Sequence, residues 1–187
     1  MAVQTQLPQR VTWEEFLALP ETMQKCEVVD GELITSPAPT WEHQVIAMNV
    51  AKALDTFVKR RKLGQVAIAP VDVVIQKKPK LRVRQPDVLF ISHERKSIIS
   101  TRVEGGPDLV VEILSSSDTR AMLDKKLKDY CAVGVRECWL VSIEAETVEV
   151  LRLSKRGAER IGLYGIGDVV VSEVLTGLKL STKKIFN

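Results

Sequence analysis

In three stretches of the chain, apolar residues recur three and four positions apart, which is the period of a helix with one buried face. The longest stretch predicts a helix over about 41–62, and a later one predicts a helix over about 118–132. A short helix over 13–18 is expected near the start, because Thr12 and Glu15 have the spacing of a capping box. Two principal helices and one short helix are therefore expected.

The boundaries of the two principal helices also carry sequence signals. Gly64 follows the first pattern and is expected to end that helix, and Gly134 is expected to close the second. The polar residues 116–118 offer hydrogen-bonding side chains that are candidates to cap the start of the second helix.

The other apolar residues lie in short runs that are typical of strands. Asp30-Gly31 separates two such runs and predicts a β-hairpin. The basic stretch KKPKLRVR is expected to be a loop. This order of elements predicts an α/β fold, of mixed α+β character, with a central mixed sheet flanked by helices. The further strands are expected over about 65–76, 85–92, 107–115, 136–143, 147–153, 158–164 and 169–171.

Length and composition fit one soluble domain. The 187 residues suit a single domain over 1–187, with 1–10 as a flexible N-terminal segment. No apolar run approaches the roughly 18 residues of a membrane span, and the start lacks a signal peptide. The net charge of +3 excludes a histone-like polycation. The cysteines lack the spacing of a zinc site or a disulfide scaffold, and we expect buried or neutral thiols in a reducing cytoplasm: Cys26, Cys131 and Cys138.

Carboxylates stand inside apolar strand patterns. Glu112 interrupts the run LVVEIL, where an unpaired charge would be costly, and Asp87 leads directly into VLFIS. Asp108 precedes the first of these runs, and Glu32 opens the second strand of the hairpin. If each acid is interpreted alone, the simpler expectation is that Asp87 and Asp108 are strand-edge or turn residues and that Glu32 is exposed. Glu112 alone would then be expected to form a buried salt bridge. Taken together, such acids favour a shared divalent cation.

A lysine on the second principal helix is a candidate partner for these acids. At about 100° per residue, Lys126 lies roughly 60° from Leu123, at the edge of the apolar stripe. The alternative is that its stem covers apolar surface and its ammonium reaches water. Two carboxylates that hold Mg²⁺ or Mn²⁺, with a lysine beside them, suit the hydrolysis of a phosphodiester bond.

Four motifs occur in an order that matches a known family: VVDGEL, QPDVLFIS, GPDLVVEILSSSD and KKLKDYCAVGVRECWLV, preceded by TWEEFLALP. In this the chain resembles the Uma-type family of restriction-endonuclease-like proteins, long catalogued as a domain of unknown function and grouped with the PD-(D/E)xK nuclease superfamily. The resemblance covers nearly the whole chain. It implies a restriction-endonuclease-like core with Asp87 and Glu112 as metal ligands and Glu32 as an additional acid near the metal.

The chain departs from the superfamily signature at the lysine. The signature places it two residues after Glu112, but that residue is Leu114. The resemblance therefore implies a lysine from the following helix, which selects Lys126. Glu27 and Tyr130 also stand at motif positions as possible supports of the site. The resemblance also concerns two further positions. His43 stands where the family often has histidine, and Cys26 replaces the tyrosine that the hairpin motif usually carries.

The leading hypothesis is a Mg²⁺- or Mn²⁺-dependent DNA endonuclease. The basic segments KKPKLRVR and KRRK are candidate contacts to phosphates, although charged runs are usually solvated surface. One alternative is a catalytically silent domain on the nuclease fold that binds nucleic acid or a protein partner; another is an enzyme for a different phosphoester. The chain has no phosphate loop of the GxxxxGK[ST] type. We expect a cytoplasmic protein that forms a homodimer.

Overall fold

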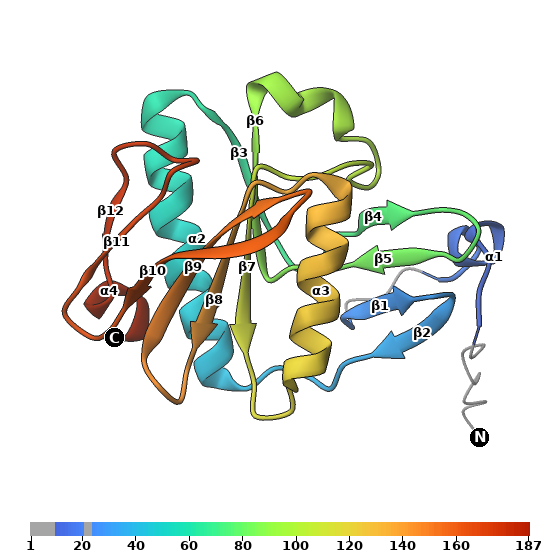
Figure 1. The fold of residues 1–187 in the computed structure, drawn as a ribbon, viewed down its shortest axis with the longest axis horizontal. Helices are drawn as coiled ribbons and strands as arrows, with labels where there is room; N and C mark the ends of the chain where they lie inside the picture. Colours follow the sequence, from blue (N-terminus) through green and yellow to red (C-terminus); the bar gives the residue numbers. More distant parts are fainter. Residues whose placement is uncertain (1–9, 21–23) are drawn as a thin grey trace.

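A six-stranded mixed sheet lies at the centre of the structure, a computed structural model that describes residues 10–20 and 24–187 (Figure 1). Its strand order is β10-β9-β8-β7-β6-β3, and within it β7 and β8 run parallel while the other neighbours are antiparallel. The strands are β3 (Gly64–Ile68), β6 (Val88–Ser92), β7 (Leu109–Leu114), β8 (Glu137–Ser142), β9 (Thr147–Ser154) and β10 (Gly157–Tyr164).

Helices cover both faces of this sheet, as the sequence predicted. The apolar stripe of α2 (Trp41–Arg61) packs against the face that carries Leu109, Val111 and Ile113. The opposite face carries Val110 and packs on α3 (Arg120–Val133) through Tyr130. Successive side chains of a strand point to opposite faces of the sheet. Both faces of β7 are covered by helices and carry apolar side chains, except at Glu112, which points to the α3 side.

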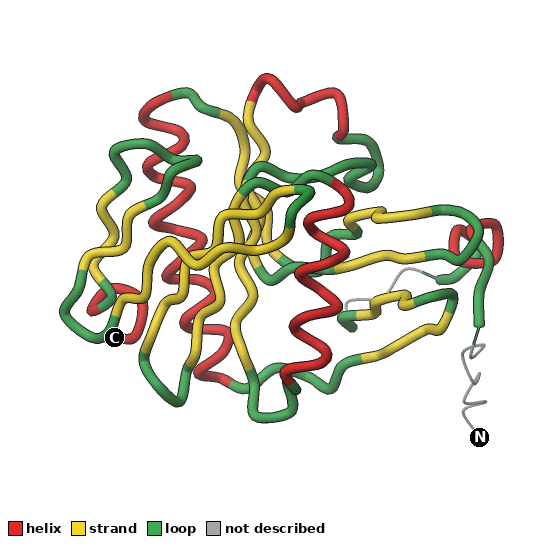
Figure 2. The backbone as a smooth tube through the Cα atoms, in the orientation of Figure 1, coloured by secondary structure: helices red, strands yellow, loops and turns green. Residues whose placement is uncertain are grey.

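A second, four-stranded sheet of order β2-β1-β5-β4 lies beside α3 (Figure 2). The predicted Asp30-Gly31 turn is confirmed, with positive φ at both residues, as a tight two-residue hairpin requires. The expectation of a loop over KKPKLRVR was wrong for its last part. Val83 there is fully buried, and its strand pairs with one strand on each side. The flanking Arg82 and Arg84 do not need to reach solvent, because each contacts an acid. The strands are β1 (Cys26–Val29), β2 (Glu32–Thr35), β4 (Val73–Gln76) and β5 (Arg82–Arg84).

The single strand predicted over 65–76 was also wrong. It forms two strands in different sheets, β3 in the central sheet and β4 in the smaller one. Pro70 stands between them and has no N–H to donate to a sheet, so the ladder ends there and the chain passes from one sheet to the other.

Two of the predicted helix boundaries differ from the structure. Helix α2 ends at Arg61 and is closed by Lys62 in the left-handed conformation (φ 54°), so Gly64 does not end it. Gly64 instead opens β3, where a Cβ atom would lie 2.1 Å from the Ile91 carbonyl oxygen. Thr119, rather than residues 116–118, caps α3. Gly134 closes α3 as predicted, at φ 88°.

The remaining elements are short. The C-terminal chain forms a two-stranded sheet and a final helix, of which β12 and α4 were not predicted. No helix in the described ranges is long and apolar enough to cross a membrane. Most of the expected flexible segment 1–10 lies outside the described residues, and the assignment of 1–187 to one domain stays a prediction. The short elements are α1 (Trp13–Leu17), the 3₁₀ helix η1 (His93–Ile98), β11 (Val169–Val171), β12 (Lys179–Ser181) and α4 (Lys183–Phe186).

Candidate functional site

Glu112 meets two polar side chains from α3. Its side chain is 4% exposed, and its Oε2 accepts a hydrogen bond of 2.9 Å from Lys126 Nζ. The hydroxyl of Tyr130, one helical turn further along α3, donates to Oε1. The two donors are four residues apart and so project from the same side of the helix. The structure therefore brings together the acid and the lysine that the sequence singled out.

Asp87 is placed beside Glu112 by the pairing of β6 with β7. Its amide donates to the Val111 carbonyl over 3.0 Å, and its Oδ2 accepts from the Ile113 amide over 2.7 Å. Asp87, a residue that is 4% exposed, is thus fixed by its amide and its carboxylate to the backbone on the two sides of Glu112. Both predicted acids lie at one point of the central sheet.

Lys25 lies between the two acids and was missed by sequence reasoning. Its Nζ is 2.9 Å from Asp87 Oδ1 and 3.8 Å from Glu112 Oε2. Burial lowers the pKa of Lys25, but the charges of Glu112 and Asp87 outweigh burial and raise it, so the side chain is a cation. The only local signal in the sequence is that a cation directly precedes the first strand of the hairpin motif.

A layer of ion pairs lies behind Lys126. Glu27 on β1 has its Oε1 3.7 Å from Lys126 Nζ and its Oε2 3.0 Å from Arg84. Arg84 in turn contacts Asp129 of α3 over 2.6 Å. These contacts join the small sheet to α3. Arg84 and Asp129 were not among the predicted residues, because their role depends on two sheets meeting in space.

The charges of the connected cluster balance. Asp129 also pairs with Arg82, which joins it to Asp30 and Lys125. The five carboxylates Glu27, Asp30, Asp87, Glu112 and Asp129 thus face the five cations Lys25, Arg82, Arg84, Lys125 and Lys126. A further cation therefore has to compete with the lysines for the carboxylate oxygens.

His43 reaches the same point from the first turn of α2. Its Nε2 is 3.5 Å from Asp87 Oδ2, and Thr40, the cap of the helix, accepts from the His43 amide. The other ring nitrogen, Nδ1, is buried without a hydrogen-bond partner in the described part of the chain. Buried polar atoms are usually paired, so Nδ1, which lies on a different edge of the ring from the Nε2 that faces Asp87, is a position for a further hydrogen-bond partner.

Glu32 is not brought to the cluster. It is exposed, it faces Val29 across the hairpin, and β2 forms the outer edge of the small sheet (Figure 1). The hairpin acid that reaches the cluster is Glu27. Asp108 serves a different purpose: it is 1% exposed and accepts from the Ser92 amide, near Arg136.

The surroundings fix the protonation of the cluster. Burial raises the pKa of Asp87, yet His43 and Lys25 outweigh burial and hold it below its ordinary value. For Lys126, burial lowers the pKa, but Glu112 and Glu27 raise it well above the ordinary range. Burial and the charge of Glu112 both raise the pKa of Tyr130, which stays a hydrogen-bond donor. At neutral pH the cluster therefore contains an ionised Asp87, paired with Lys25, and a charged Lys126, paired with Glu112.

The donor set fits a hard divalent cation that uses few protein ligands. Within the described ranges no three His, Cys, Asp or Glu side chains gather closely enough to hold a metal ion. Zinc sites need three or four such ligands, so they do not fit. Mg²⁺ keeps several waters and is commonly bound by one or two carboxylates together with substrate phosphate, which the pair Asp87 and Glu112 can provide.

The fold and the site define a nuclease-like α/β protein, with a mixed sheet, one acid on β7, one acid directly before β6 and an adjoining lysine. The chain belongs to the Uma2 family, described as "Putative restriction endonuclease", whose model matches residues 13–183. It is also similar to the crystal structure of a "putative nuclease belonging to DUF820" from Anabaena variabilis, with a TM-score of 0.78 and 24% identity. That similarity covers 94% of this chain and 97% of the other. No curated protein matches the chain. The fold is thus shared with a protein of that description.

Proposed function

We propose that this chain is a Mg²⁺- or Mn²⁺-dependent endonuclease that hydrolyses phosphodiester bonds in DNA. The observation that supports this most directly is the convergence of Asp87, directly before β6, with Glu112 on the neighbouring β7, where Lys126 donates to Glu112. Membership of the Uma2 family supports the same reaction class. Asp87 and Glu112 would hold the cation, which when bound would polarise the phosphate and lower the pKa of a water.

The remaining groups hold these acids and the lysine in place. The Ile113 amide fixes Asp87, and Tyr130 fixes one oxygen of Glu112, so neither carboxylate needs to reorganise when it takes a ligand. Lys126 keeps its proton because Glu112 and Glu27 stabilise its charge. As a fixed cation next to the acids, it stabilises the negative charge that develops on the phosphate in the transition state.

Lys25 gives this site a property of its own. Its ammonium already neutralises Asp87 and approaches Glu112, so a divalent cation has to compete with it for the same oxygens. The same contact favours a second candidate function, a catalytically silent domain that binds nucleic acid or a protein partner, in which Lys25 and Lys126 balance the buried acids without a metal.

Cleavage of supercoiled plasmid DNA distinguishes the two functions. Purified wild type, Asp87→Asn and Glu112→Gln are compared with Mg²⁺, with Mn²⁺ and with EDTA. Glu144→Gln is the matched control, because Glu144 is an exposed acid in the turn between β8 and β9. The nuclease function predicts metal-dependent nicking by wild type and the control, lowered at least about a hundredfold in both site variants.

The result that would overturn the proposal is equally specific. If wild type does not nick DNA, and calorimetry shows no Mn²⁺ binding that Glu112→Gln removes, the silent domain is the better description. Nicking that persists in both site variants would place the activity elsewhere or in a contaminant.

A further inference from the structure

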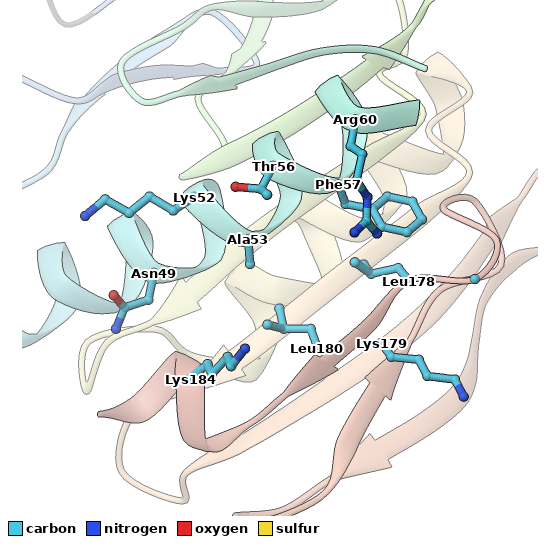
Figure 3. Close-up of a pocket in the computed structure, with 11 residues that line it drawn as sticks. Asn49, Lys52, Ala53, Thr56, Phe57, Arg60, Leu178, Lys179, Leu180 and Lys184 are labelled. Carbon is cyan, nitrogen blue, oxygen red and sulfur yellow. The ribbon is translucent and has the colours of Figure 1, made fainter. Parts of the chain in front are cut away.

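A groove of about 540 Å³ runs along α2 on a side that shares no residue with the candidate site (Figure 3). One wall is α2, from Asn49 to Arg60, and the other is the C-terminal chain from Gly177 to Lys184. At 1.5 Å per residue, the α2 wall is roughly 16 Å long. The floor is apolar and is formed by Ala53, Phe57, Leu178 and Leu180.

The rim of this groove is positively charged and has no carboxylate. Its charged lining residues are Lys52, Arg60, Lys179 and Lys184, all of them exposed. Across the described ranges, none of these four is joined to an acid by an ion pair. In Figure 3 the guanidinium of Arg60 descends from α2 toward Leu178, the amine of Lys184 points toward Leu180, and Lys179 extends away from the groove. Unpaired cations on both walls make this a surface for anions.

The two walls are held together without a ligand. Asn49 of α2 donates to the carbonyls of Ile185 and Asn187, over 3.1 and 2.9 Å. Ile185 is itself fully buried in the core that α2 covers. A preformed groove loses little conformational entropy when it takes a ligand, so its charge is available for binding.

Several cations of the other basic segments are less available. Within KKPKLRVR, Arg82 contacts Asp30 over 2.7 Å, and Arg84 lies in the buried ion pairs described above. Lys59, at the end of α2, is paired with Asp55 over 2.8 Å. The rim of the groove therefore concentrates cations that have no internal partner.

We propose that this groove binds the phosphodiester backbone of a nucleic acid. One strand of DNA carries a negative charge about every 3.4 Å of helix axis, so a groove of this length spans about five phosphates. Contacts of this kind bind without reading sequence and supply attraction that the candidate site, whose charges balance, lacks. The inference goes beyond the proposed function, because such binding needs neither metal nor catalysis.

Fluorescence anisotropy of a labelled DNA duplex in EDTA tests this surface separately from nuclease activity. The groove variant is Arg60→Glu/Lys184→Glu. The matched control is Lys155→Glu/Arg156→Glu, which changes the net charge equally at two exposed residues of the β9–β10 turn. We expect at least about tenfold weaker binding for the groove variant than for the control, and a slope of log Kd against log salt smaller by about two.

The neutral variant Arg60→Gln/Lys184→Gln is a second test in case the charge-reversed protein misfolds. Thermal melting is recorded for every variant. A smaller loss of affinity in the same direction is expected for the neutral variant. Equal binding by the groove and control variants would overturn the proposal. Competition by polyglutamate is the second test. If polyglutamate displaces the duplex as effectively as unlabelled DNA does at equal charge, the proposal is also overturned, because the groove would then fit an acidic protein.

Discussion

The ammonium of Lys25 lies 2.9 Å from Oδ1 of Asp87, a residue 62 positions further along the chain. The contact closes the side of Asp87 that faces Glu112, whose Oε2 is 3.8 Å from the same nitrogen. Asp87 is also tied to the backbone of β7. Two acids that would repel each other are thus balanced by a cation of the protein itself, in the position where the proposed function requires a metal.

Replacing Lys25 by methionine is expected to strengthen Mn²⁺ binding. The substitution keeps the size of the side chain but removes a positive charge from between the two metal ligands. Because like charges about 4 Å apart repel by several kcal/mol at a protein surface, we expect at least about a tenfold lower Kd by calorimetry. Lys125→Met is the control, since Lys125 pairs with Asp30 and forms no ion pair with Asp87 or Glu112 in the described residues. Unchanged or weaker binding in Lys25→Met would contradict a competition between this ammonium and the metal.

The two acids of the hairpin are expected to differ in importance. Glu27 contacts Lys126 and Arg84, whereas Glu32 is exposed at the outer edge of the small sheet. We expect Glu27→Gln to lower the plasmid nicking rate at least about tenfold more than Glu32→Gln, because it loosens the lysine beside Glu112. Circular dichroism checks the fold of both. A larger loss of nicking rate in Glu32→Gln than in Glu27→Gln would place Glu32 in the site, as the family resemblance implies.

The position of the lysine can be tested by moving it. Leu114 occupies the signature position two residues after Glu112 and points to the same side of β7. We expect Lys126→Met to lower the nicking rate about a hundredfold, and Leu114→Lys/Lys126→Met to recover at least about a tenth of the loss. Leu114→Lys alone measures what the added lysine does when Lys126 is present. A folded double variant without any recovery would argue that Lys126 acts mainly by pairing the buried acids.

The hydroxyl of Tyr130 is expected to stabilise the folded protein. Tyr130→Phe leaves a buried oxygen of Glu112 without this donor, which should lower the free energy of unfolding by roughly 1–3 kcal/mol. Tyr164→Phe is a close control, because the Tyr164 hydroxyl has no hydrogen bond within the described part of the chain. Urea unfolding measures both variants. Equal losses in the two would show that the contact with Glu112 contributes nothing particular.

The pKa of Asp87 predicts how stability depends on pH. Despite burial, His43 and Lys25 hold this pKa below its ordinary value. The unfolded chain therefore takes up a proton at a higher pH than the folded protein, so the stabilising contribution is complete above about pH 4 and is lost below it. We expect the difference in unfolding free energy between wild type and Asp87→Asn to shrink as the pH falls below about 4. A difference that stays constant over this range would mean that Asp87 is not held ionised.

The parts of the site that sequence reasoning found share one property: each breaks a local pattern. Glu112 interrupts an apolar strand, Asp87 leads into another, and Lys126 lies at the edge of an apolar helical stripe. Such breaks are costly unless a partner exists, so they point to a site before its geometry is known. The Asp30-Gly31 hairpin and the cap at Gly134 could also be predicted, because the residues that favour a turn or a helix end act locally.

The parts that sequence reasoning missed depend on contacts between distant segments. Lys25 is an ordinary polar residue until the hairpin is placed next to Asp87, and Arg84 is one cation in a basic run until it meets Asp129. The strand around Val83 was hidden for the same reason, since its arginines suggested a solvated loop. The cytoplasmic location and the homodimer expected from the sequence stay predictions.

The most direct test of the metal site is a crystal structure of the protein soaked in Mn²⁺, with an anomalous difference map. The proposed function predicts a peak within ligand distance of the carboxylates of Asp87 and Glu112, with the Lys25 ammonium displaced from Asp87. A map without a peak at these two side chains, in crystals where Lys25 keeps its contact with Asp87, would contradict it.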